Sequence, residues 1–158
     1  MFDVLVFIFE NYFANHALAN NHTFSEDKIM EQELSAAGFE HNDIIGAFDW
    51  FQQMESMITT SDTCYSHHKT AMRAFTNAEI SKINTESLGF IVFLQQANVI
   101  NDVERDLIID RAMALQQLEI HIEETRWITM IALWNKGREK DYLFVEDALF
   151  NPRGLTTQ

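Results

Sequence analysis

Residues 101–115 read Asn-Asp-Val-Glu-Arg-Asp-Leu-Ile-Ile-Asp-Arg-Ala-Met-Ala-Leu. Asn101 and Glu104 form a capping box, in which each side chain accepts a hydrogen bond from the backbone N–H of the other residue. Apolar residues then recur at steps of three and four, which predicts an amphipathic helix from residue 102. The apolar residues Val103, Leu107, Ile108, Ala112 and Leu115 are predicted to point inward, and the charged residues Arg105, Asp106, Asp110 and Arg111 outward.

Similar start and stop signals recur through the C-terminal half. Thr76 and Glu79 form a second capping box, and Thr85 is predicted to cap the helix that follows it. Residues 122–135 have almost no polar face in their second half, which is typical of the most buried helix of a domain. A last helix near residues 139–150 is expected to end before the single proline.

The N-terminal part of the chain predicts three further helices. Residues 2–19 place apolar and aromatic side chains at helical spacing, and Thr23 with Glu26 predicts a capping box that opens the second helix. Gly38 is predicted to end that helix in a left-handed conformation. Asn42 then precedes a third helical pattern that continues to residue 57.

These patterns together predict an all-α fold, a compact multi-helix domain of about seven to eight helices in two lobes. The N-terminal lobe is an acidic three-helix unit over residues 1–57, and the C-terminal lobe covers residues 75–150. Residues 58–74 are polar and without periodicity, which predicts an exposed linker, and residues 151–158 are predicted to form a loose tail. We expect one core shared by both lobes, because both have strong apolar faces.

The charge of the chain restricts its partners. The 158 residues include 24 Asp and Glu against 11 Lys and Arg, which gives a net charge of -13 at pH 7. Residues 1–60 carry ten of the carboxylates and one Lys, so a net charge of -9 lies there. Such a surface repels nucleic-acid phosphates and anionic lipids, and it favours basic protein partners or simple solubility.

The apolar run near the N-terminus does not predict a targeting or membrane segment. Asp3 and Glu10 enclose six apolar residues without a basic flank. A signal-peptide core needs about seven or more apolar residues, and a membrane-spanning helix needs about 20. The single Cys excludes a disulfide framework. We therefore expect a cytoplasmic protein that does not associate with membranes.

The sequence lacks the motifs of the common enzyme classes. Its five glycines are far apart, so it contains no phosphate-binding loop and no dinucleotide fingerprint. It also contains no Gly-x-Ser-x-Gly, His-Glu-x-x-His or Glu-x-x-His pattern. Carboxylate pairs are common in so acidic a chain and indicate solvated helix faces rather than acid–base pairs. We expect no catalytic activity and no cofactor.

The candidate metal ligands are Cys64, His67 and His68 in the polar linker. A thiolate and two imidazoles suit zinc, but a tetrahedral zinc site needs four ligands and this segment supplies three. A fourth ligand could come from His22, His41 or a carboxylate, and nothing in the sequence specifies which. A catalytic thiolate would further need a fixed base and an orienting group. A solvated linker is the preferred interpretation over a metal or catalytic site.

Two binding hypotheses remain. The first is a non-enzymatic protein-interaction or adaptor module, with an unidentified and basic protein partner. Its acidic and aromatic docking face would comprise Asp43, Asp49, Trp50 and Phe51. The second is a regulator associated with DNA processing, which would use a helix-turn-helix-like pair at residues 86–115. There the second helix offers only Arg105 and Arg111 beside three acids, which disfavours direct contact with DNA. The sequence specifies no oligomeric state.

Several short segments resemble the Smg family of bacterial proteins. They are Met1-Phe2-Asp3-Val4-Leu5, Gly38-Phe39 with Asp43-Ile44, Ala47 and Trp50, Gly89-Phe90 with Phe93-Leu94, Asp110-Arg111-Ala112-Met113-Ala114-Leu115, Trp127, and Leu133-Trp134-Asn135. The resemblance covers residues 1–57 and 75–150 and leaves out the linker. It implies a helical bacterial protein of the cytoplasm with no assigned biochemical function, and it supplies no catalytic residues. It also implies an association with DNA metabolism, because family members are often encoded near a DNA-processing protein.

Overall fold

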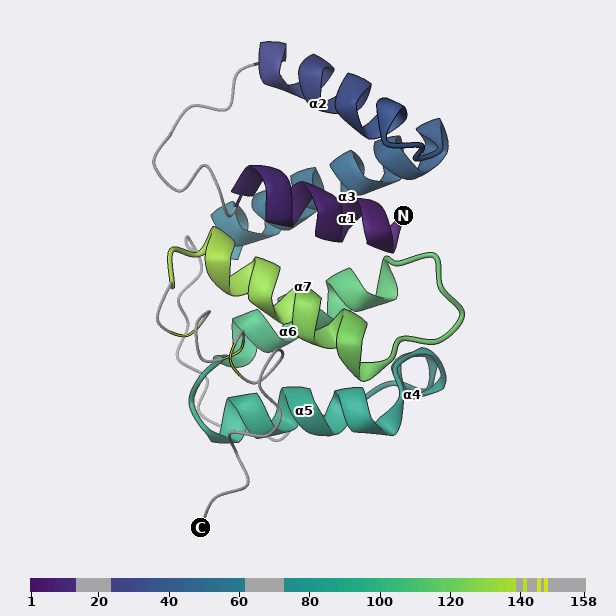
Figure 1. Ribbon diagram of the computed structural model, residues 1–158. Helices are drawn as coiled ribbons and strands as arrows, with labels where there is room; N and C mark the ends of the chain where they lie inside the picture. Colours follow the sequence, from purple (N-terminus) through teal and green to yellow (C-terminus); the bar gives the residue numbers. More distant parts are fainter. Residues whose placement is uncertain (14–23, 62–72, 139–140, 142–144, 146, 148–158) are drawn as a thin grey trace. The chain divides into compact units, whose positions relative to one another are not determined.

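The computed structural model describes residues 1–13, 24–61, 73–138, 141, 145 and 147. Over these residues the chain is all-α, as predicted, and Figure 1 shows its helices. They are α1 (Phe2–Ile8), continued by a π-helical segment (Phe9–Phe13), α2 (Phe24–Ala36), α3 (His41–Ser61), α4 (Asn77–Lys82), α5 (Thr85–Gln96), α6 (Asp102–Met113) and α7 (Ile122–Asn135). The chain divides into two compact units, Met1–Gln53 and Met54–Gln158. The boundary lies within α3, and the predicted shared core stays a prediction.

In the N-terminal unit, the predicted apolar face of the first helix is only partly correct: Leu5 and Phe9 are buried as predicted, but Phe2 and Val6 are half-buried, and Val4 and Ile8 are buried instead. The turn after α2 is as predicted, because Gly38 has a φ of 96° and its N–H donates to the carbonyl of Ser35 at 3.1 Å. Glycine adopts this left-handed conformation without the strain that a Cβ would add. The predicted capping box of Thr23 and Glu26 lies outside the described residues.

Helix α3 is longer than predicted. It begins at His41 rather than after Asn42, and it continues to Ser61, so the first four residues of the predicted linker are helical. The hydroxyls of Thr59 and Thr60 donate to the carbonyls of Glu55 at 2.9 Å and Ser56 at 2.8 Å, which satisfies these polar side chains within the helix. Residues 62–72, the predicted last helix apart from isolated positions, and the predicted tail lie outside the described residues.

In the C-terminal unit, α7 packs against α5 and α6, and α6 also contacts α4 and α5 (Figure 1). The second half of α7 is buried from Ile128 to Leu133, as its composition predicts, while Trp127 and Trp134 are half-buried. An isolated parallel bridge joins Ile83 to Ile120: the Ile120 N–H donates to the Lys82 carbonyl at 2.7 Å. This bridge fixes the segment before α5 beside the segment before α7.

Three of the C-terminal helices begin at side-chain caps. The capping boxes of Thr76 with Glu79 and of Asn101 with Glu104 are both present, as predicted. The predicted cap at Thr85 is wrong by one residue. Asn84 caps α5 instead, and its Oδ1 accepts a hydrogen bond from the Ser87 N–H at 2.9 Å. Asn84 has the extended backbone that a capping residue requires, whereas Thr85 is already helical.

The predicted orientation of α6 is only partly correct. Leu107, Ile108, Ala112 and Leu115 are buried as predicted, but Val103 is 43% exposed. Arg105 and Arg111 were predicted to point outward, and they are 6% and 4% exposed. Because α6 is covered by α4, α5 and α7, its buried surface is wider than the one face that an amphipathic pattern predicts.

Candidate functional site

The predicted interaction face is only partly exposed. Trp50 is 2% exposed, so its indole belongs to the core and does not project as an aromatic anchor, and Phe51 is half-buried with its ring edge-on to that of Trp50. The Asp43 carboxylate forms an ion pair with the amino group of Met1, with 2.8 Å between Oδ2 and the nitrogen. Asp49 is exposed. Of the four predicted residues, Asp49 is the one that is both charged and exposed.

The exposed surface of α3 also includes an apolar residue that the prediction missed. Ile45 is 45% exposed and lies one helical turn before Asp49, and Gln52 is exposed one turn further on. The three positions lie at i, i+4 and i+7, so they share one side of the helix. We call Ile45, Asp49 and Gln52 the α3 face.

The predicted metal ligands Cys64, His67 and His68 lie outside the described residues. Among the residues that are described, no group of three or more His, Cys, Asp or Glu side chains converges as a metal site would.

A chain of charged side chains connects α4 and α6 in the C-terminal unit. Arg73 donates to both carboxylate oxygens of Glu79, at 3.0 and 2.7 Å, and its Nε lies 3.0 Å from Asp106 Oδ1. Arg105 donates to the same Asp106 oxygen at 3.0 Å and lies 3.3 Å from Asp102. The guanidinium of Arg105 is therefore engaged by acids of its own helix and is not free to reach the base edges of DNA.

The pair of Arg73 and Glu79 shifts the pKa of both groups. The hydrogen bond from Arg73 holds the pKa of Glu79 below its ordinary value, with help from the Thr76 N–H at 2.8 Å, although burial opposes this shift. The hydrogen bond to Glu79 raises the pKa of Arg73 in turn. Glu79 thus both completes the cap of α4 and holds Arg73 in place.

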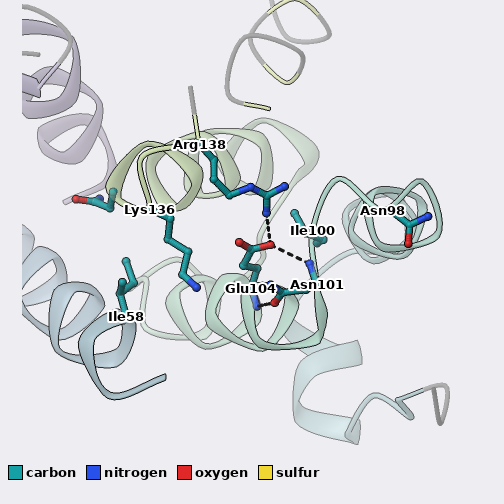
Figure 2. A pocket seen from close by; sticks show the side chains of 8 residues that line it. Ile58, Asn98, Ile100, Asn101, Glu104, Lys136 and Arg138 are labelled. Atoms are coloured by element: carbon teal, nitrogen blue, oxygen red, sulfur yellow. Dashed lines mark hydrogen bonds and ion pairs between the residues drawn. The ribbon is translucent and has the colours of Figure 1, made fainter. Parts of the chain in front are cut away.

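An open cavity of about 580 Å³ lies in the C-terminal unit, within the range of small-molecule sites. It is bounded by the end of α3, the segment between α5 and α6, the start of α6 and the end of α7 (Figure 2). Its lining residues are Ile58, Asn98, Ile100, Asn101, Glu104, Asn135, Lys136 and Arg138.

Glu104 is the most buried charged group of this cavity, with a side chain that is 3% exposed. Its Oε2 accepts a hydrogen bond from the Asn101 N–H at 2.8 Å and a second from Arg138 Nη1. Figure 2 shows both interactions ending on this one oxygen. The carboxylate is thereby held rigidly and presents a fixed acceptor to the cavity.

All three guanidinium nitrogens of Arg138 donate hydrogen bonds. Besides Glu104, Arg138 donates through Nε to Asp141 at 2.8 Å and through Nη2 to the carbonyl of Val99. Burial lowers the pKa of Arg138, but the hydrogen bonds to Glu104 and Asp141 outweigh burial and raise the pKa above its ordinary value. The guanidinium closes one end of the cavity and ties the end of α7 to the start of α6.

Sequence reasoning found part of this cavity and missed the rest. The capping box identified Asn101 and Glu104, because that motif is read within four residues. Arg138 is 34 residues from Glu104, and no local pattern connects the two.

None of the helices that the structure describes is both long and apolar enough to cross a membrane.

Comparison with known proteins shows similarity over nearly the whole chain. The family described as "Protein of unknown function (DUF494)" matches residues 1–156. The "Protein Smg homolog" of Methylobacillus flagellatus is 48% identical over 96% of this chain and 95% of its own length. Proteins of the same name from Shewanella woodyi and Bordetella pertussis are 35% and 36% identical, each over 94% of its own length and over 95% and 94% of this chain. No solved structure matches the chain. With a family match of this extent and relatives of this identity, the chain belongs to the Smg family (DUF494) of bacterial proteins.

Proposed function

We propose that this protein is a non-catalytic interaction module of the bacterial cytoplasm, which docks on a basic protein partner through the α3 face. The observation that carries the proposal is the exposed Ile45 one turn from the exposed Asp49. The carboxylate of Asp49 forms no ion pair with any residue that the structure describes. An apolar side chain beside an unpaired carboxylate suits a partner helix that carries an apolar residue and a Lys or Arg one turn apart.

The charge of the surrounding sequence supports a basic partner. Residues 1–60 carry a net charge of -9, and Asp3, Glu33 and Glu40 are exposed there as well as Asp49. A dense negative surface speeds the approach of a positively charged partner, and this effect weakens as salt rises. The proposed interaction is therefore sensitive to salt.

Affinity capture with paired variants tests this proposal. Tagged wild-type protein, Asp49→Arg and Glu119→Arg are each used to capture proteins from bacterial lysate at low salt. Glu119 is an exposed acid of the C-terminal unit, so its variant changes the net charge by the same amount as Asp49→Arg. We expect partners that wild type and Glu119→Arg retain and that Asp49→Arg loses by about tenfold or more.

Ile45→Ser separates the apolar contribution from the charge. It is expected to weaken capture of the same partners without changing their salt dependence. Equal capture by all variants, or no protein above background with wild type, would contradict the proposal.

The alternative role in DNA processing receives less support. Its helix-turn-helix-like pair corresponds to α5 and α6, and the two arginines expected to face DNA, Arg105 and Arg111, are buried beside acids. A gel shift with duplex DNA at about 50 mM salt should show no tight binding, and salt-sensitive binding would reverse the order of the two proposals.

A further inference from the structure

We propose that the cavity of the C-terminal unit binds a small zwitterion, an α-amino acid with an apolar side chain, between the Glu104 carboxylate and the Lys136 ammonium. This site is separate from the α3 face and goes beyond the proposed docking function.

The first observation is an unused acceptor on a buried carboxylate. Both donors to Glu104 bind Oε2, and no hydrogen bond reaches Oε1 from the part of the chain that the structure describes. Figure 2 shows Oε1 pointing to the side of the cavity where Lys136 lies. Oε1 is not among the buried side-chain atoms that lack a hydrogen-bond partner, so it opens onto the cavity, where a donor from a ligand can replace water. An ammonium group is the strongest donor that a ligand can bring to this oxygen.

The second observation is a cation on the opposite wall. Lys136 lines the cavity at the end of α7, and its ammonium forms no hydrogen bond or ion pair with the described residues. The ammonium of Lys136 does not form an ion pair with Glu104, so the two groups are more than 4.0 Å apart. An open acceptor and an open cation thus face one space without neutralising each other, and a carboxylate can bind the cation.

The charge balance favours a ligand that carries both signs. Among the residues that the structure describes here, Glu104 and Asp141 contribute two negative charges and Arg138 and Lys136 two positive ones, so these four charges balance. A simple anion at Lys136 would leave Oε1 without a donor, and a simple cation at Glu104 would leave Lys136 unpaired. A zwitterion satisfies both groups and preserves this balance.

Two isoleucines of the cavity wall favour a ligand with an apolar side chain. Ile58 and Ile100 also line the cavity, and Ile100 is 3% exposed in the chain. A ligand that carries an aliphatic or aromatic group beyond its charged end can place that group against Ile58, which is half-buried and still has apolar surface to remove from water, whereas Ile100 is already buried. The volume of about 580 Å³ accommodates such a molecule.

Titration of the full chain with amino acids tests the site. Backbone amide signals of ¹⁵N-labelled protein are followed while L-valine, L-leucine, L-methionine or L-phenylalanine is added to about 5 mM. We expect saturable shifts of Asn98, Asn101 and Lys136 with at least one of these ligands. Lys136→Met should weaken that binding by about tenfold or more, since it removes the charged partner of the carboxylate. Lys28→Met, a matched change at an exposed lysine of the N-terminal unit, should leave it unchanged.

Ligands with one charge removed identify each half of the site. For L-leucine these are 4-methylpentanoate, which lacks the ammonium, and 3-methylbutylamine, which lacks the carboxylate; both should bind more weakly than leucine. Glu104→Gln should weaken the binding of leucine and leave the binding of 4-methylpentanoate unchanged. Circular dichroism checks that this variant is folded. If it is unfolded, Lys136→Met decides the question alone. Absence of saturable binding by all four amino acids, or binding that Lys136→Met leaves unchanged, would overturn the proposal.

Discussion

The two units of the chain use charged side chains in different ways. In the C-terminal unit Glu79, Glu104, Arg105 and Arg111 are at most 8% exposed, and each is paired with an opposite charge. In the N-terminal unit no charged side chain that the structure describes is buried. His41 Nδ1 lies 3.5 Å from the Glu31 carboxylate at the surface, and the amino group of Met1 pairs with Asp43, whose side chain is 36% exposed.

This difference indicates which charges the fold depends on. A buried pair stabilises a fold only while both partners remain, so the charges of the C-terminal unit cannot be changed one at a time without cost. Exposed charges contribute little to stability and can be selected for a partner. The contrast leaves the exposed charges of the N-terminal unit available for the docking that we propose on the α3 face.

The largest effect that sharpens this comparison is expected from Arg138→Met. Removal of the guanidinium leaves the buried Glu104 carboxylate without its counter-charge, which should lower the free energy of unfolding by about 3 kcal/mol. Lys136→Met is the matched control, because its ammonium has no ion-pair partner among the described residues, and it should change stability by less than about 0.5 kcal/mol. Urea denaturation of both variants measures the difference. Equal losses would show that the pair has no special role.

The next effect concerns Glu79 and depends on pH. Because its pKa is lower in the folded chain than the ordinary value of 4.5, the ionised group stabilises the fold above that value. This stabilisation is lost as the pH falls from 4.5 through the lowered pKa. Glu79→Gln should cost about 2 kcal/mol at neutral pH and should reduce the loss of stability on acidification. Urea midpoints of wild type and Glu79→Gln, measured from neutral pH down to below pH 4.5, check this prediction. If both proteins lose stability equally on acidification, Glu79 does not contribute the pH dependence.

A smaller effect distinguishes the observed cap of α5 from the predicted one. Asn84→Ala should destabilise the protein by about 1 kcal/mol, because the Ser87 N–H loses its acceptor. Thr85→Ala should change stability by less than about 0.5 kcal/mol, since Thr85 is the first residue of the helix rather than its cap. Thermal or urea unfolding measures both variants. A greater loss of stability in Thr85→Ala than in Asn84→Ala would contradict Asn84 as the cap of α5.

The smallest effect on stability is expected in the N-terminal unit. Asp49→Asn removes an exposed charge that has no ion-pair partner in the described chain, so the free energy of unfolding should change by less than about 0.5 kcal/mol. Partner capture by this variant should nonetheless fall. A large loss of stability would break the comparison between the units, because it would assign a structural role to the charge of α3.

Features encoded within a few residues were predicted well. The capping boxes at Thr76 and Asn101 and the glycine stop at Gly38 depend only on neighbouring residues, and all three are present. The family resemblance rested on short local segments and is confirmed over residues 1–156. The cap of α5 was misplaced because adjacent Asn and Thr side chains are both good caps, and the choice between them depends on the backbone at Asn84.

Features that depend on contacts between helices were missed. Arg105 and Arg111 were assigned to the surface because they are charged, yet three neighbouring helices cover α6 and bury them beside Asp106 and Asp110. Trp50 was included in the docking face because aromatic residues near a helix end can anchor an interface, and it is buried. Periodicity identifies one buried face of a helix but does not reveal how many neighbours surround it.

The sequence by itself determined the helical class, most helix starts and the family, since hydrogen bonding and capping in a helix are local and repeat every three to four residues. Only the tertiary structure decided which charges are buried, that Glu104 meets Arg138 from 34 residues away, and that Ile45 and Asp49 remain exposed together. The reason is physical: burial and ion pairing depend on which surfaces come together, and segments distant in sequence supply those surfaces.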